Sequence, residues 1–207
     1  MKKSAQILSV IFHPYLLPLY GGGMIVSYSF LEILPVSIRL LIVSGIFLFS
    51  GILPMLFHLT LSLFYLNKSE KKPYVRLTEI LLYTVFLIFA TIYLHKLNLP
   101  YWTQGYLAGA ALSSALTWII NISGWRISFF MSGLGALMGL VVMMSLVYSP
   151  IPIGLLIALI VITGMMGTTR QLLDRNTFAQ ILTGWICGLI CVLLVTQVFR
   201  YNLFSFT

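Results

Sequence analysis

Apolar runs of about twenty residues, separated by short polar segments, constrain this chain more than any other feature. A helix needs about 20 mostly apolar residues to cross a bilayer. The composition agrees with this reading, because 60% of the 207 residues are hydrophobic, 8% are charged and the mean hydropathy is +1.04, whereas a soluble domain has about 25% charged residues. We predict an all-α, polytopic transmembrane helical bundle that forms a single integral membrane domain over residues 1–207. Its seven predicted spans cover residues 5–31, 36–66, 77–94, 101–121, 127–148, 151–168 and 178–198.

The first run contains residues that interrupt helices. Pro14, Pro18 and the three glycines at 21–23 fall inside it. Proline removes a backbone donor and clashes with the preceding turn, so we predict a kink or a local break here. The polar segments between the runs are too short to hold a soluble domain, and the predicted function therefore lies in the membrane or at its surfaces.

Basic residues are unevenly divided between the two predicted membrane sides. With seven crossings, nine lie on the side of the amino terminus and three on the other side. Short loops rich in Lys and Arg remain cytoplasmic, so we predict a cytoplasmic amino terminus and cytoplasmic basic loops. The nine are Lys2, Lys3, Lys68, Lys71, Lys72, Arg76, Arg126, Arg170 and Arg175, and the three are Arg39, Lys96 and Arg200.

Three of the basic segments follow the second, fourth and sixth predicted spans, so two crossings separate each from the next. All three are therefore expected on one face, where their side chains can converge into a cationic site. Guanidinium and ammonium groups at helix ends suit a phosphate. The alternative is a solvated basic rim that serves only to orient the protein.

Acidic residues and histidines are few. We expect Glu79 to pair locally with Arg76, and Asp174 to pair with Arg170 or Arg175 on one helix. No cluster with the pattern of metal ligands is present, so no metal site and no cofactor is predicted. Cys187 and Cys191 are expected to be free, small apolar residues rather than a disulfide.

Small residues at four-residue spacing predict close helix packing within the chain. The pairs are Gly135 with Gly139 and Gly184 with Gly188. Such residues let two helix backbones approach each other in a membrane. Trp102, at the start of a predicted span, is expected to be an interfacial anchor.

Four segments carry a family resemblance. They read FHPYLLPLYG at 12–21, KKPYVRLTEILLY at 71–83, WRISFFMSGLGALMG at 125–139 and MGTTRQLLDRNTFAQILTGWICG at 166–188. In order and spacing they resemble the type 2 phosphatidic acid phosphatase (PAP2) family, and more narrowly small PAP2-like membrane proteins of the Bacteroidetes type. The resemblance implies a six-helix core with an extra span, located in the bacterial inner membrane.

The residues that perform the family's chemistry are replaced in this chain. In that family a third-motif histidine attacks phosphorus, an aspartate orients it and a second-motif histidine protonates the leaving group. The matching positions hold Asn176, Gln180 and Phe130, or Trp125 in another register. None of these side chains can act as nucleophile, orienting carboxylate or proton donor. The resemblance therefore implies a pseudoenzyme.

The residues that would hold the phosphate are better retained. His13 is the one candidate for a replacement base or nucleophile, and the sequence offers it no orienting carboxylate. The predicted phosphate- or head-group-binding residues are Lys72, Arg76, Arg126, Thr169, Arg170 and Asn176.

Three functions remain open from the sequence. The first is a catalytically inactive PAP2-like protein whose basic face binds a protein partner in the membrane or an anionic lipid head group, such as that of a phospholipid or a polyprenyl phosphate. The second is an active lipid-phosphate phosphatase or phosphotransferase with a non-standard catalytic residue. The third is a membrane assembly subunit or a small transporter. No nucleic-acid partner is predicted.

Overall fold

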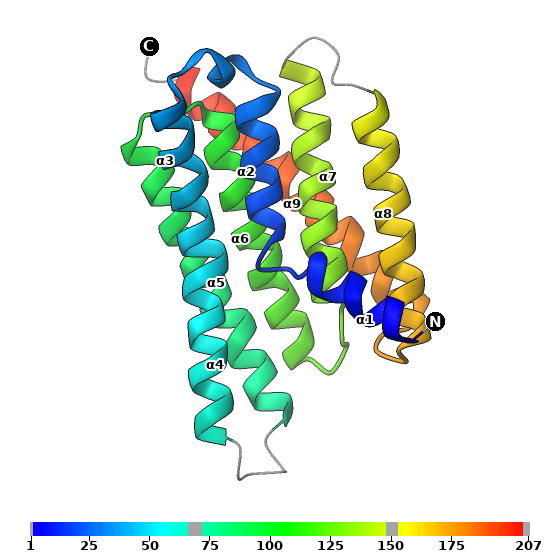
Figure 1. Cartoon of the computed structure of the whole chain (residues 1–207). Helices are drawn as coiled ribbons and strands as arrows, with labels where there is room; N and C mark the ends of the chain where they lie inside the picture. The colour runs from blue at the N-terminus through cyan, green and yellow to red at the C-terminus, as the bar shows by residue number, and fades with distance from the viewer. Residues whose placement is uncertain (1, 66–71, 148–152, 205–207) are drawn as a thin grey trace.

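In the computed structural model of the chain, six of the described helices are long and apolar enough to cross a membrane (Figure 1). The structure describes residues 2–65, 72–147 and 153–204, and every regular element within these ranges is helical. This confirms an all-helical protein with candidate membrane spans. The spans are Val36–Leu61, Leu77–Lys96, Tyr101–Ile122, Phe129–Val147, Ile153–Leu172 and Phe178–Arg200.

The count of seven spans is not confirmed, because the first apolar run is divided. α1 (Lys2–Ile11) ends before Pro14, and α2 (Leu17–Ser27) begins with Pro18 in its first turn. Proline is tolerated there because the first turn has no internal partner for a backbone N–H. The predicted break is therefore confirmed. The 11 residues of α2 cover about 16 Å, roughly half of the hydrocarbon core.

The second run forms one nearly continuous helix from three elements. α3 (Val36–Phe47) passes through a π-helical turn, η2 (Leu48–Ile52), into α4 (Leu53–Tyr65). Pro54, two residues after the turn, lacks the N–H that a regular α-helix would use, which accounts for the local widening. Ser50 donates its hydroxyl to the Ile46 carbonyl oxygen, one turn earlier, at 2.8 Å.

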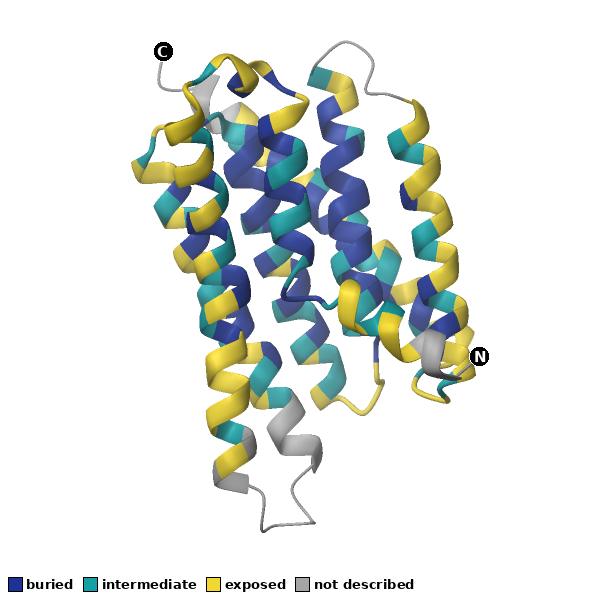
Figure 2. Cartoon of the chain, in the orientation of Figure 1, coloured by how far each residue is buried: buried dark blue, intermediate teal, exposed yellow. Residues whose placement is uncertain are grey.

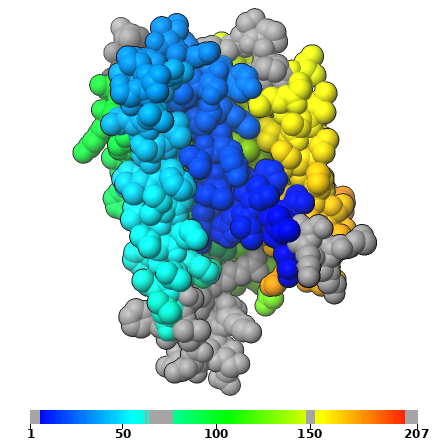
Figure 3. Space-filling model, viewed as in Figure 1, coloured from blue at the N-terminus to red at the C-terminus, as the bar shows by residue number. Residues whose placement is uncertain are grey.

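The remaining helices are α5 (Lys72–Lys96), α6 (Tyr101–Ile122), α7 (Phe129–Val147), α8 (Ile153–Leu172) and α9 (Phe178–Phe204). The end of α4, the start of α5 and the connections 123–128 and 173–177 all lie at the lower end of the bundle in Figure 1. α1 contacts α8 and lies across this part of the surface rather than along the bundle (Figure 3). The described parts of the three basic segments thus share one end.

The core lies where α9 packs against α6 and α7, and glycines on these helices explain the close packing. A Cβ on Gly135 would collide with the carbonyl oxygen of Trp185, and one on Gly188 would collide with that of Ser132. The predicted role of these glycines in packing within the chain is therefore confirmed. Trp102 is 2% exposed and belongs to this core, so its prediction as an interfacial anchor is wrong.

Exposed residues follow the outer faces of the helices (Figure 2), and large apolar side chains are exposed on α3, α4, α5, α8 and α9. Leu40, Leu56 and Ile157 are more than half exposed. Such a surface is costly in water and suits lipid chains. Cys187 and Cys191 are both free, as predicted.

Candidate functional site

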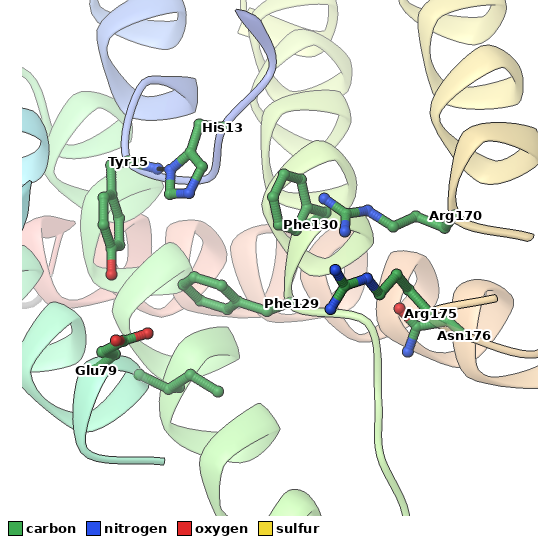
Figure 4. A pocket seen from close by; sticks show the side chains of 9 residues that line it. His13, Tyr15, Glu79, Phe129, Phe130, Arg170, Arg175 and Asn176 are labelled. Atoms are coloured by element: carbon green, nitrogen blue, oxygen red, sulfur yellow. Dashed lines mark hydrogen bonds between the residues drawn. The ribbon is translucent and has the colours of Figure 1, made fainter. Parts of the chain in front are cut away.

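A cavity of about 220 Å³ opens at the basic end of the bundle (Figure 4). Its wall comes from the α1–α2 connection, α5, α7, the end of α8 and the turn that follows α8. The residues that line it are His13, Tyr15, Glu79, Ile80, Phe129, Phe130, Arg170, Arg175 and Asn176. Segments far apart in the sequence therefore meet at one polar site.

The end of α8 brings two arginines to the same wall. α8 ends at Leu172, and the backbone N–H of Arg175 donates to the carbonyl oxygen of Arg170 at 3.1 Å. Asp174 adopts a left-handed conformation (φ 49°) in this turn. The predicted helical ion pair of Asp174 is therefore not formed, because the helix ends before the pair's spacing is complete. Arg170 and Arg175 instead point into the cavity together (Figure 4).

Arg170 is held by an aromatic ring. Its side chain is 8% exposed, and its Cζ lies 3.2 Å from the centroid of the Phe130 ring. This cation–π contact fixes the plane of the guanidinium group. The histidine position of the second motif falls on Phe130 or on Trp125, depending on the register. Phe130 lines the cavity, whereas Trp125 is exposed in the 123–128 connection.

Asn176 lies at the cavity in a network of amides. Its Nδ2 donates to the carbonyl oxygen of Arg126 and to Oε1 of Gln180, both at 3.3 Å. The same Gln180 oxygen accepts from the backbone N–H of Thr177 at 3.1 Å. Asn176 and Gln180, which the resemblance places at the positions of the nucleophile and the orienting carboxylate, are thus joined by a hydrogen bond between neutral groups.

The other predicted binding residues lie elsewhere or outside the described side chains. Arg126 has an exposed side chain and contributes its carbonyl oxygen to Asn176. Thr169 is buried, and its hydroxyl donates to the Met165 carbonyl oxygen at 2.7 Å rather than lining the cavity. Lys72 and Arg76 belong to the first turns of α5, and their side chains lie outside the described part of the chain.

His13 lines the cavity as a neutral, half-buried imidazole. Burial, followed by the nearby His58 and the charge of Arg170, lowers the pKa of His13 from 6.5 to about 4. The backbone N–H of Tyr15 donates to Nδ1 of His13 at 3.4 Å, and this bond favours the tautomer with a proton on Nε2. His13 is therefore a hydrogen-bond donor toward the cavity at neutral pH.

Glu79 was missed as a site residue by sequence reasoning. Its carboxylate lies 2.7 Å from Nδ1 of His58, a contact that joins α4 to α5. The expected local pair of Glu79 with Arg76 falls on a side chain outside the described part of the chain. The sequence held a usable signal, since His58 and Glu79 are ionisable residues near the same ends of two consecutive spans.

Comparisons with models of protein families, with curated proteins and with solved structures found no match to this chain.

Proposed function

We propose that this chain is a PAP2-like membrane protein that binds an anionic, phosphate-bearing head group in the cavity and does not hydrolyse it. The observation that carries the proposal is that Arg170 and Arg175 point into one cavity together with Asn176. The proposed location is the bacterial inner membrane, with the amino terminus and the basic end on the cytoplasmic side. The nine-to-three distribution of basic residues supports that orientation.

The chemistry of the wall favours a phosphate. Arginine presents several N–H donors in a plane and forms paired hydrogen bonds with phosphate oxygens. Arg170 keeps a fixed plane because it stacks on Phe130, so less side-chain entropy is lost when an anion binds. The proton on Nε2 of His13 is a further donor of the kind that phosphate oxygens accept.

The same wall lacks the groups that phosphoryl transfer through a protein intermediate requires. Asn176 and Gln180 are amides, and neither is a nucleophile or a base. Phe130 carries no transferable proton. Two arginines without a nucleophile polarise a bound phosphate ester but do not cleave it.

A second candidate, an active phosphatase that uses His13, is favoured by one observation, the position of His13 beside Arg170 in the cavity. Two features of this residue count against it. Its Nδ1 already accepts a hydrogen bond, and Glu79, the carboxylate of the cavity wall, is bonded to His58. Among the described residues, His13 therefore has no carboxylate partner to stabilise the positive charge that attack on phosphorus would create.

The test is lipid binding by the purified protein in detergent. Phosphatidic acid and phosphatidylglycerol should bind, and diacylglycerol with the same acyl chains should not. Arg175→Gln should weaken the binding of both phospholipids, whereas Arg126→Gln, at the same end but outside the cavity wall, should not. Equal binding of phosphatidic acid and diacylglycerol would overturn the proposal.

A further inference from the structure

The cavity has two walls of opposite charge. Arg170, Arg175 and Asn176 form one wall, and Glu79 with Tyr15 forms the other, with Phe129 and Phe130 between them (Figure 4). A site for a purely anionic group would not gain from a carboxylate. Glu79 lies in a candidate membrane span, where an ionisable side chain is costly and marks a function.

Glu79 is held in place from outside the cavity. His58, which does not line this cavity, contacts one carboxylate oxygen at 2.7 Å. A carboxylate has two oxygens and about four acceptor positions, so this contact leaves acceptor capacity on the cavity side. The hydroxyl of Tyr15 points toward the same carboxylate (Figure 4). Burial, and then the charge of Glu79, raises the pKa of Tyr15, which keeps its hydroxyl protonated.

A ligand that satisfies both walls carries an anion at one end and a cation at the other. A phosphate fits the arginine wall. A primary ammonium group fits the Glu79 wall, because its N–H groups donate to a carboxylate, which a quaternary ammonium cannot do. A phosphodiester that ends in a hydroxyl offers no positive charge to the Glu79 wall.

We infer that the cavity recognises a zwitterionic head group, a phosphate ester of ethanolamine, with the phosphate on the Arg170–Arg175 wall and the ammonium group on Glu79. This inference rests on the proposed function and adds the second half of the ligand. The same chemistry occurs in phosphatidylethanolamine and in soluble glycerophosphoethanolamine.

The experiment measures binding of three phospholipids with identical acyl chains to the purified protein. Phosphatidylethanolamine should bind about tenfold more tightly than phosphatidylglycerol, which corresponds to one additional ion pair of moderate strength. It should also bind more tightly than phosphatidylcholine. Displacement of bound phosphatidylethanolamine by glycerophosphoethanolamine would show that the head group alone suffices, and preference without displacement would identify the lipid as the ligand.

Glu79→Gln provides the decisive variant, because the amide can still bond to His58. It should weaken phosphatidylethanolamine binding and strengthen phosphatidylglycerol binding, a change in opposite directions that loss of folding cannot produce. Glu32→Gln, the same change at the other end of the bundle, should leave the preference unaltered.

The two proposals fail in different ways. An unchanged ratio of the two lipids in Glu79→Gln, or phosphatidylcholine binding as tightly as phosphatidylethanolamine, would overturn the zwitterion inference alone. Arg175→Gln without effect on any phospholipid would overturn the proposed function as well.

Discussion

The guanidinium carbon of Arg170 lies 3.2 Å from the centroid of the Phe130 ring. By resemblance, Phe130 stands at the position of a proton donor and Arg170 at that of a phosphate-binding arginine. An aromatic ring at the first position cannot donate a proton, but it can hold the arginine at the second. This pair therefore favours binding over catalysis.

Removing the ring should weaken anion binding. Phe130→Leu keeps an apolar side chain but loses the cation–π contact, which contributes about 0.5–2 kcal/mol. We expect phosphatidylglycerol affinity to fall by a factor of about 2 to 30 in a lipid-binding titration. Phe178→Leu, an exposed residue outside the cavity wall, is the control. Unchanged affinity in Phe130→Leu would show that the ring does not support the binding arginine.

Removing the guanidinium group of Arg170 should weaken anion binding more than removing the Phe130 ring does. Arg170→Ala loses a charge-assisted hydrogen bond, so we expect binding of anionic lipids to weaken by about 1.5–3 kcal/mol. The same lipid-binding titration measures this affinity, and Arg126→Ala is the matched control at the same end of the bundle. An Arg170→Ala protein that is folded and binds phosphatidylglycerol as tightly as wild type would remove Arg170 from the proposed site.

Turnover should stay near background. We expect no phosphate release above that of Arg170→Ala from either phosphatidic acid or a polyprenyl diphosphate, because Asn176 and Gln180 supply neither nucleophile nor base. Phosphate release by the wild-type protein that disappears in Arg170→Ala would contradict this. His13→Ala would then separate a His13 mechanism from any other.

His13 should make thermal stability depend on pH. The pKa of this residue is about 4 in the folded protein and 6.5 in its ordinary state, so the unfolded chain binds more protons between these values. The free energy of unfolding therefore decreases as the pH falls from about 7 toward about 4, and this contribution is constant above about 7. Thermal midpoints should fall more over this range in wild type than in His13→Gln. Identical pH profiles would show that His13 is not buried in neutral form.

Close packing between α7 and α9 should make one glycine irreplaceable. Gly188→Ala places a methyl group against the Ser132 carbonyl oxygen, and such overpacking typically costs about 1–3 kcal/mol. The thermal midpoint should fall accordingly. Gly164→Ala on α8 is the control, because its Cβ would meet open space among the described residues. Equal midpoints for the two variants would contradict the packing between α7 and α9.

The two ends of the bundle should report opposite membrane sides. In intact cells, a membrane-impermeant maleimide should label Asn98→Cys and not Ser123→Cys, since the basic end is proposed to be cytoplasmic. The wild-type chain gives the background from Cys187 and Cys191, which lie within α9. Labelling of Ser123→Cys alone would reverse the proposed orientation.

The lengths of the apolar runs and the sizes of individual residues let the sequence determine the helices of this protein and the places where they pack closely. Runs of about twenty apolar residues have to become helices in a membrane, because helices satisfy their own backbone hydrogen bonds. Pro14 and Pro18 predicted the break in the first run, and the spaced glycines predicted close packing of helices. These features act within one segment, so neighbouring residues suffice to predict them.

The tertiary structure decided which polar side chains share a cavity. His13, Glu79 and Arg170 are separated by scores of residues, and contacts between helices bring them together. Glu79 contacts His58 on the preceding helix, because the rotation and depth of the two helices select which side chains meet. The division of the first run into α1 and a half-length α2 likewise depends on where each piece packs. Local composition indicates that proline interrupts a helix, but the directions of the two pieces depend on α8, which contacts α1, and on α3 and α7, which contact α2.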